Sequence, residues 1–310
     1  MRVVLNKIWR HAFSALTFFL PAEKRIANER RMRGKEEFRK LNLADCVIVS
    51  FGKSGRTWLR VMISGFYQKK FGLKDSLMIG FDNAHRKNPG VPKIFFTHDN
   101  YLKDFTGHDQ DKSDYYGKKV VLLARHPGDV AVSQYFQWQH RMRPVKKKLN
   151  NYPPHGAEIS AYDFVMDRGC GLAHIIEYLN LWADEAAKMK ELLLVRYEDM
   201  KKDPKATLRR IVEFMGTPGS EAELDHAVEY ASFDNMRQME QKKTFWLSGS
   251  RMVAKDPSNP HSFKTRRGKV GGFRDYFDDE QEKVIGGMID STLSPFYGYL
   301  PQEREGEASA

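Results

Sequence analysis

Residues 46–58 read Cys-Val-Ile-Val-Ser-Phe-Gly-Lys-Ser-Gly-Arg-Thr-Trp, and this stretch decides the fold class. The apolar run from Cys46 to Phe51 predicts a buried strand, and a helical pattern from Thr57 to Lys69 follows a turn of small residues. Such a turn aims backbone N–H groups and the positive end of a helix dipole at one point, which favours a bound anion. Lys53 adds a mobile positive charge. Taken alone, the stretch also fits an ordinary strand-to-helix turn with a surface lysine.

Further along the chain, strand-like runs alternate with helical patterns. The predicted strands are 46–51, 93–97, 119–124 and 192–196, and the predicted helices are 57–69, 127–140, 171–190, 204–215 and 221–230. This alternation predicts an α/β fold, a three-layer domain with a central parallel sheet. Ligands should bind at the carboxyl ends of the strands. Residues 141–162 and 247–267 show no periodicity, so we expect two long loops there.

Composition narrows the class of protein. Lys and Arg outnumber Asp and Glu by 51 to 40, a net charge of +11 that favours anionic ligands, nucleic acid or an acidic membrane without choosing among them. The cysteines, Cys46 and Cys170, form neither a disulfide framework nor a cluster with zinc-ligand spacing. No apolar run reaches the ~18 to 20 residues of a membrane-spanning helix. We therefore expect a cytoplasmic globular protein.

The N-terminal segment differs from the rest of the chain. Residues 3–20 place apolar side chains on one helical stripe, which predicts an amphipathic helix, and residues 21–40 are dominated by charges and resemble an arm or exposed helix. We expect residues 1–40 to be an amphipathic helix and basic arm, and 41–310 the catalytic domain. The helix could lie on the cytoplasmic face of a membrane, or its stripe could pack onto the domain.

The glycine-rich turn is not the loop of nucleotide triphosphatases, because here the lysine precedes the second glycine. Residues 52–58 are instead similar to the 5′-phosphosulfate loop of sulfotransferases that use 3′-phosphoadenosine 5′-phosphosulfate (PAPS), typically Pro-Lys-Ser-Gly-Thr-Thr-Trp. Gly52 and Arg56 depart from that pattern. The resemblance implies that the 5′-phosphate is held by Lys53, Ser54, Gly55, Arg56, Thr57 and Trp58.

Two later segments strengthen the resemblance, which covers about residues 45–280. After the third predicted strand, an arginine and a serine eight residues later match the family's 3′-phosphate motif. A basic segment near the C-terminus resembles the family's segment Arg-Lys-Gly-x-x-Gly-Asp-Trp-Lys. The resemblance implies that the 3′-phosphate is held by Arg125, Ser133, Arg266, Arg267 and Gly268. Gly272 and Phe273 replace Asp-Trp.

Smaller matches concern the adenine. Tyr197 lies in a segment similar to the family's Tyr-Glu-Asp-Met, and residues 231–233 resemble its adenine-contacting Thr-Ser-Phe. Trp58 and Phe233 would then enclose the adenine ring by stacking. Ala231 lacks the hydroxyl group that the family has there.

The candidate general base is His98, at the end of the second predicted strand. Imidazole titrates near neutrality and can take the proton of an acceptor hydroxyl, although a histidine at a strand end is often only structural. His98 matches the family's Lys-Thr-His segment, in which the lysine is replaced here by Phe96. The resemblance implies that Lys53 neutralises charge on the leaving phosphate.

The predicted function is therefore direct in-line transfer of a sulfuryl group from PAPS to a hydroxyl of a lipid, glycan or small molecule, with no metal implied. A basic loop bearing Arg141, Arg143 and Lys146 to Lys148 favours an anionic or membrane-embedded acceptor, although such charges can also be simply solvated. We expect no nucleic acid partner. The alternatives are a magnesium-dependent kinase with a related loop, and a basic module that binds nucleic acid or membrane.

Overall fold

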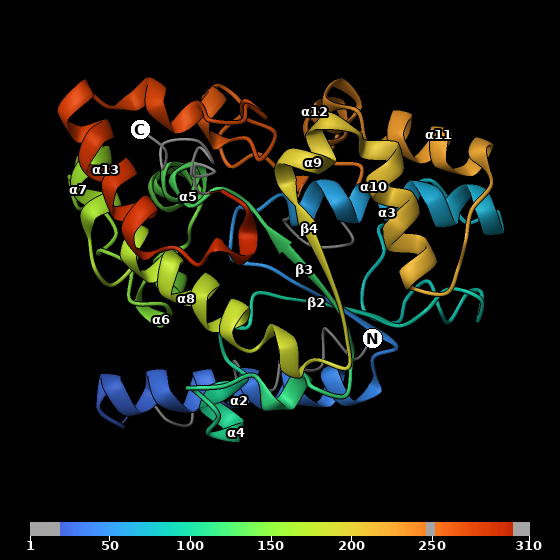
Figure 1. Cartoon of the computed structure of the whole chain (residues 1–310), viewed down its shortest axis with the longest axis horizontal. Helices are drawn as coiled ribbons and strands as arrows, with labels where there is room; N and C mark the ends of the chain where they lie inside the picture. The colour runs from blue at the N-terminus through green and yellow to red at the C-terminus, as the bar shows by residue number, and fades with distance from the viewer. Residues whose placement is uncertain (1–18, 246–251, 300–310) are drawn as a thin grey trace, which may run out of the picture.

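The computed structural model describes residues 19–245 and 252–299, and its centre is a parallel sheet (Figure 1). The strands are β1 (Cys46–Val49), β2 (Ile94–Thr97), β3 (Lys119–Ala124) and β4 (Glu191–Arg196), in the order β2-β1-β3-β4. Val49 at the end of β1 pairs with Thr97 on one side and Leu122 on the other. The carboxyl ends of β1, β2 and β3 therefore meet at one edge of the sheet, as the sequence predicted.

Helices cover both faces of the sheet. The α-helices are α2 (Ala22–Leu43), α3 (Arg56–Phe71), α4 (Lys103–Thr106), α5 (Pro127–His140), α6 (Pro144–Leu149), α7 (Ala161–Met166), α8 (Leu172–Asp184), α9 (Tyr197–Lys202), α10 (Pro204–Phe214), α11 (Glu221–Tyr230), α12 (Phe233–Gln241) and α13 (Asp279–Thr292). In Figure 1, α3, α10, α11 and α12 lie on one side of the sheet, and α5, α8 and α13 on the other.

Alternation along the strands explains the layers. Ile48, Val121 and Leu123 face a core shared with α3, α10 and α11. Val120 and Leu122 point the other way, into a core shared with α5, α8 and α13. Since successive side chains of a strand point to opposite faces, a continuous apolar strand buries both faces of the sheet. The predicted three-layer α/β fold is confirmed.

Three boundary predictions are wrong in part. The helix predicted at 171–190 ends at Asp184, and a 3₁₀ turn from Ala186 to Lys188 leads into β4. The loop predicted at 141–162 contains α6, which begins with Pro144 at its first position, a favoured place for proline. β1 ends at Val49, before the turn to α3 begins, so Ser50 and Phe51 belong to the loop.

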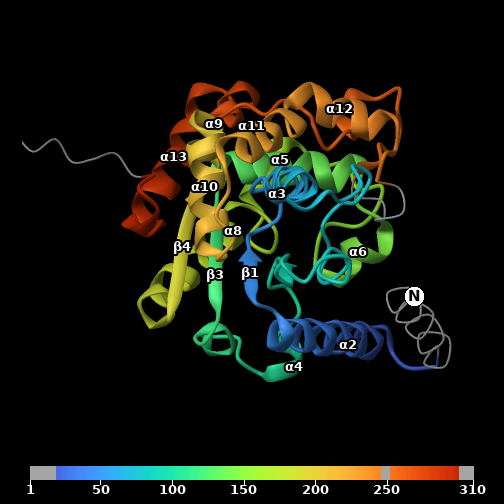
Figure 2. The same ribbon diagram turned by 90° about the vertical axis from the view of Figure 1, so that its right-hand side faces the viewer.

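Residues 22–43 form the helix α2, and one face of this helix is packed against the rest of the protein. α2 lies alongside α4 (Figure 2), and a Cβ on its Gly34 would stand 2.2 Å from the Tyr101 carbonyl oxygen. Arg30 donates to Asp104 Oδ1 at 2.9 Å and to the carbonyls of Leu149 and Asn100 at 2.7 and 3.1 Å. The described half of the predicted arm is thus a helix with one packed face. Its division from the catalytic domain at residue 40 stays a prediction.

The predicted amphipathic helix at 3–20 lies almost wholly outside the described residues. Within residues 19–245 and 252–299, no helix combines the length and apolar composition needed to cross a membrane.

Candidate active site

A cavity of about 850 Å³ opens where β1, β2 and β3 end. The cavity is lined by every predicted site residue except Ser54, which is buried within the loop: Lys53, Gly55, Arg56, Thr57, Trp58, His98, Arg125, Ser133, Tyr197, Phe233, Arg266, Arg267 and Gly268. These residues come from segments more than 200 positions apart in the chain. The fold therefore brings the three predicted anion motifs and the candidate base together.

The first loop has an unusual backbone. Lys53 and Gly55 both have positive φ, 72° and 92°, and α3 begins directly after Gly55. A Cβ on Gly55 would stand 2.5 Å from Cδ2 of Tyr197, so no larger residue fits there. No side chain caps the N-terminus of α3, and its first turn holds no acidic residue. An uncapped helix end of this kind favours a bound anion, so the loop has the geometry that its predicted role requires.

Arg125, at the end of β3, joins the motifs. Its guanidinium donates to Asp129 Oδ2 at 3.2 Å and to the carbonyls of Lys269 and Lys53 at 3.0 and 3.4 Å. It also lies 4.3 Å from the centre of the Tyr197 ring. Among the described residues, its Nε is buried and has no hydrogen-bond partner. Arg125 thus links the first loop to the C-terminal basic segment.

The C-terminal basic segment is held by aromatic and acidic side chains. The Arg266 guanidinium lies 4.0 Å from the Phe136 ring centre and donates to the Tyr276 hydroxyl. Arg267 donates to the same hydroxyl at 3.1 Å and pairs with Asp275. Gly268 has a φ of 61°, a conformation that favours glycine. The arginines are therefore fixed before any anion binds.

The departure from Asp-Trp at 272–273 has a local explanation. Phe273 stacks on His126 with ring centres 5.1 Å apart, and its N–H donates to Asp129 Oδ1 at 3.0 Å. A Cβ on Gly128 would stand only 3.0 Å from the Phe273 ring. Phenylalanine thus packs the basic segment against the beginning of α5.

Two aromatic side chains border the predicted adenine site. The Trp58 indole donates to the carbonyl of Ala231 at 2.9 Å, and its ring lies edge-on to Tyr197 at 5.7 Å. Phe233 is 44% exposed, and a Cβ on Gly268 would be 3.6 Å from its ring. Residue 231 therefore contacts Trp58 through its backbone, which does not require the hydroxyl that Ala231 lacks.

His98 is oriented by one hydrogen bond. Its Nδ1 lies 2.9 Å from the carbonyl oxygen of Ser50. Since a carbonyl oxygen only accepts, Nδ1 carries the proton and Nε2 is the basic nitrogen. Burial, and then the charge of Arg56, hold the pKa of His98 well below 6.5. The imidazole is therefore neutral at physiological pH and able to accept a proton.

The surroundings of Lys53 disfavour the charged form of its amine. Its Nζ lies 3.5 Å from Oε1 of Gln137. Burial, followed by the positive charges of Arg141 and Arg125, lowers the pKa of Lys53 to about 7. An anion placed beside this amine would restore its charged form, since opposite charges favour ionisation.

Sequence reasoning missed Arg60 and the pair Gln134 and Tyr152. Arg60 lines the cavity one turn after Arg56, and its guanidinium lies 3.8 Å from the ring centre of Phe96, the residue that replaces the family's lysine. The i, i+4 spacing from Arg56 on one helix was the available signal.

Gln134 and Tyr152 form a polar wall of the same cavity. Gln134 Nε2 donates to the Tyr152 hydroxyl at 2.7 Å. A Cβ on Gly52 would stand 3.1 Å from Gln134 Oε1, so the departure from proline at Gly52 leaves room for this side chain. No pattern in the sequence points to this contact.

The predicted basic loop divides into two parts. Arg143 and Lys146 are exposed and line the cavity. Lys147 is 2% exposed, with its amine 4.5 Å from the ring centre of Trp138, so it belongs to the packing of α6. Lys148 is exposed but is not part of the cavity wall. Of Lys146 to Lys148, only Lys146 therefore lines the cavity.

Comparison with known proteins identifies the family. Residues 43–296 match the model of the sulfotransferase domain. The chain is 26% identical to flavonol 3-sulfotransferase from Flaveria bidentis over 281 residues, covering 86% of each protein. It is 25% identical to sulfotransferase 2A6 from Rattus norvegicus over 275 residues, covering 81% of this chain and 85% of that one.

Solved structures agree on the fold. Mouse sulfotransferase SULT7A1 complexed with 3′-phosphoadenosine 5′-phosphate (PAP) superposes with a TM-score of 0.54 at 19% identity, covering 83% of this chain and 89% of that one. Retinol dehydratase complexed with androsterone and PAP gives 0.54 at 20% identity, covering 84% and 85%. The family predicted from the loop and strand-end motifs is confirmed, and the kinase alternative has no support in these matches. The chain belongs to the sulfotransferase family.

Proposed function

We propose that this sulfotransferase moves a sulfuryl group from PAPS directly to a hydroxyl group of its acceptor. The observation that carries the proposal is the meeting of three anion-binding segments and a neutral histidine on one cavity. The donor carries two anionic groups joined by a nucleoside, and the cavity offers two separate sets of anion donors with aromatic rings beside them. PAP in two solved neighbours supports the same donor here.

The donor site follows from the residues. We assign the 5′-phosphate to the backbone of residues 53–58, because the N-terminus of α3 lacks any cap of its own. We assign the 3′-phosphate to Arg125, Ser133 and residues 266–268, because planar guanidinium groups give two charge-assisted hydrogen bonds to one phosphate. The adenine would lie between Trp58 and Phe233, with Tyr197 supporting Trp58.

The chemical roles belong to His98 and Lys53. His98 Nε2 takes the proton of the acceptor hydroxyl as the oxygen approaches sulfur, while Ser50 holds the ring through Nδ1. PAPS supplies the sulfuryl group and a phosphate leaving group. Lys53, in its charged form, stabilises the negative charge that develops on that phosphate. Arg60 adds positive charge to the same cavity from its place against Phe96.

The acceptor side of the cavity favours an acceptor with its own negative charge. Exposed side chains of Arg143, Lys146 and Lys255 line this region. The charges of Lys264 and Lys146 also contribute to lowering the pKa of His98, after burial and Arg56, so they lie within electrostatic reach of the base. The flavonol 3-sulfotransferase that resembles this chain is named for a flavonol acceptor. We propose a hydroxyl acceptor that also carries a carboxylate, phosphate or sulfate.

We further propose a cytoplasmic protein with peripheral membrane contact through residues 1–40. α2 exposes a row of basic side chains at intervals of four residues, Arg31, Lys35 and Arg39. Such a row on one helix face is attracted to an anionic leaflet. The name of a relative, cytosolic sulfotransferase 7 of Arabidopsis thaliana, supports the compartment.

Mass spectrometry tests the function. Purified protein, PAPS and a fractionated cell extract should yield a product heavier than a hydroxyl-bearing precursor by ~80 Da, the mass of one SO₃ group. The His98→Ala variant in the same extract is the control. A wild-type protein that consumes PAPS without forming any such product would refute the proposal.

A further inference from the structure

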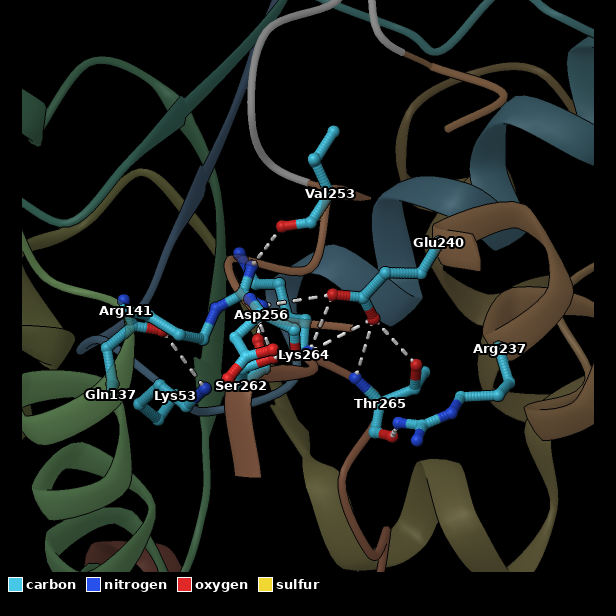
Figure 3. Close-up of polar contacts among 10 residues, drawn as sticks. All are labelled: Lys53, Gln137, Arg141, Arg237, Glu240, Val253, Asp256, Ser262, Lys264 and Thr265. Carbon is cyan, nitrogen blue, oxygen red and sulfur yellow. Dashed lines mark hydrogen bonds and ion pairs between the residues drawn. The ribbon is translucent and has the colours of Figure 1, made fainter. Parts of the chain in front are cut away.

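Glu240 is a buried carboxylate that the proposed mechanism does not use. It lies in the last turn of α12 and is 1% exposed. Its Oε1 accepts from the backbone N–H of Lys264 at 2.8 Å, and its Oε2 accepts from the N–H and the hydroxyl of Thr265 at 3.2 and 2.8 Å (Figure 3). One carboxylate thus fixes the two residues that precede Arg266.

Arg141 completes this arrangement from the opposite side. It follows α5 and pairs with Glu240 Oε1 at 3.1 Å, with the Arg141 side chain only 6% exposed. It also donates to the carbonyl of Val253 at 3.2 Å and to that of Ser262 (Figure 3). Arg237 of α12 donates to the Thr265 carbonyl at 2.8 Å. Segment 252–265, which includes no α-helix or strand, is therefore held by two side chains of α12 and by Arg141, the residue that follows α5.

The chemistry of these contacts requires a carboxylate. Every group around Glu240 is a donor: two backbone N–H groups, one hydroxyl and one guanidinium. An amide would turn an NH₂ group toward at least one of these donors and leave it unsatisfied. Burying an ionised side chain is costly unless it is paired and hydrogen-bonded. The Glu240 carboxylate meets this condition, because both of its oxygens accept hydrogen bonds.

We propose that Glu240 is a positioning residue of the donor site: through Lys264 and Thr265 it sets where Arg266, Arg267 and Gly268 meet the 3′-phosphate. The proposal rests on the donor site assigned above. Through Arg141 the same carboxylate ties this segment to α5, which carries Ser133 and the Lys53 partner Gln137. The segment that precedes Arg266 and the helix that carries Ser133 are thus joined through one ionic contact.

The test compares the affinities of PAP and AMP, because AMP lacks the 3′-phosphate. In Glu240→Gln, the affinity for PAP should fall at least about tenfold, while that for AMP should change by less than about twofold. Asp234→Asn is the matched control, since it removes one negative charge from the exposed face of the same helix and should leave both affinities unchanged. A structural defect alone would weaken both nucleotides together.

A double variant distinguishes two roles of Glu240, the positioning of Lys264 and Thr265 and the neutralisation of the Arg141 charge. Arg141→Met combined with Glu240→Met removes both buried charges and both acceptor oxygens, so the melting temperature should recover relative to Glu240→Met alone. The preference for PAP should stay lost, because the N–H groups of Lys264 and Thr265 still lack their acceptor. If the double variant regains the preference as well, Glu240 serves only to neutralise Arg141 and the proposal is overturned.

Two further outcomes distinguish the role of Glu240 from the assignment of the donor site on which it rests. A Glu240→Gln variant that keeps the wild-type preference for PAP overturns the role of Glu240 alone. A wild-type protein that binds PAP and AMP equally overturns the assignment of residues 266–268 to the 3′-phosphate, and with it this role.

Discussion

Asp129 holds Arg125 at 3.2 Å and, with the same carboxylate, accepts the backbone N–H groups of Gly271 and Phe273 at 2.9 and 3.0 Å. One buried side chain therefore fixes the arginine at the end of β3 and the turn after the C-terminal basic segment. By itself, an ion pair of Arg125 with a carboxylate four residues later would be an alternative to phosphate binding. The hydrogen bonds instead indicate that Asp129 orients Arg125. The Nε of Arg125 has no hydrogen-bond partner among the described residues.

Removing this arginine should weaken recognition of the 3′-phosphate. We expect Arg125→Met to weaken PAP binding by ~1.5 to 3 kcal/mol and to leave AMP binding nearly unchanged. Isothermal titration calorimetry of both nucleotides measures the difference. Arg196→Met is a control, because Arg196 pairs with Asp199 and lies outside the cavity. Equal losses for PAP and AMP in Arg125→Met would contradict the assignment.

Replacing the candidate base should act on turnover rather than on donor binding. His98→Ala should lower kcat by ~10² to 10⁴ and leave PAP affinity nearly unchanged, since a general base acts in the transition state. His98 must be neutral to accept a proton, and its pKa lies well below 6.5. The acid limb of the wild-type pH profile should therefore lie below pH 6.5 and vanish in the variant. A variant with normal kcat would show that another group is the base.

The strands and the anion motifs could be predicted because their signals are local. β3 is a run of six residues with its own apolar pattern, and each anion motif is contiguous in the chain. α6 could not be predicted, because Lys147 becomes part of its buried face only through the ring of Trp138. Glu240 pairs with a residue 99 positions away, and nothing in the residues around it indicates a buried carboxylate.

Lys53 should lower the folding stability of the unliganded protein, although transfer needs its charge. Its pKa of about 7 in the folded protein, against 10.5 for a solvated lysine, means that the unfolded chain binds the extra proton between these values. Folding is therefore penalised most at and below pH 7, and the penalty fades as pH rises toward 10.5. Lys53→Met should raise the melting temperature of the unliganded protein at pH 7 and slow transfer strongly. The gain should shrink at pH 9.5. A melting temperature that drops equally at both pH values would contradict this account.

The basic residues that line the cavity should act on the acceptor alone. Arg143→Glu combined with Lys146→Glu should raise the acceptor KM by about tenfold or more and spare the KM of PAPS. The matched control is Lys148→Glu, which reverses a charge on the same helix outside the cavity. Lys147 is left intact because it is buried. Steady-state kinetics with the acceptor found by mass spectrometry gives both constants, and an unchanged acceptor KM would mean that these charges are merely solvated.

Membrane contact through the N-terminal segment is the last prediction. Trp9, Phe13 and Phe19 lie on the apolar stripe predicted for residues 3–20, and the basic row of α2 could add ~1 kcal/mol per well-placed charge on an anionic leaflet. Deleting residues 1–20 leaves α2 whole, because that helix begins at Ala22 and its anchor Arg30 keeps its partners.

The truncated protein should therefore keep its melting temperature and its PAP affinity, yet no longer sediment with vesicles rich in phosphatidylserine. Arg31→Glu with Lys35→Glu in the full chain should weaken sedimentation in part, because these exposed charges would repel the anionic surface. Neutral phosphatidylcholine vesicles are the control for the electrostatic contribution to vesicle binding. If deletion instead yields insoluble protein, the stripe packs onto the catalytic domain. If sedimentation survives the deletion, the membrane contact lies elsewhere and the prediction is wrong.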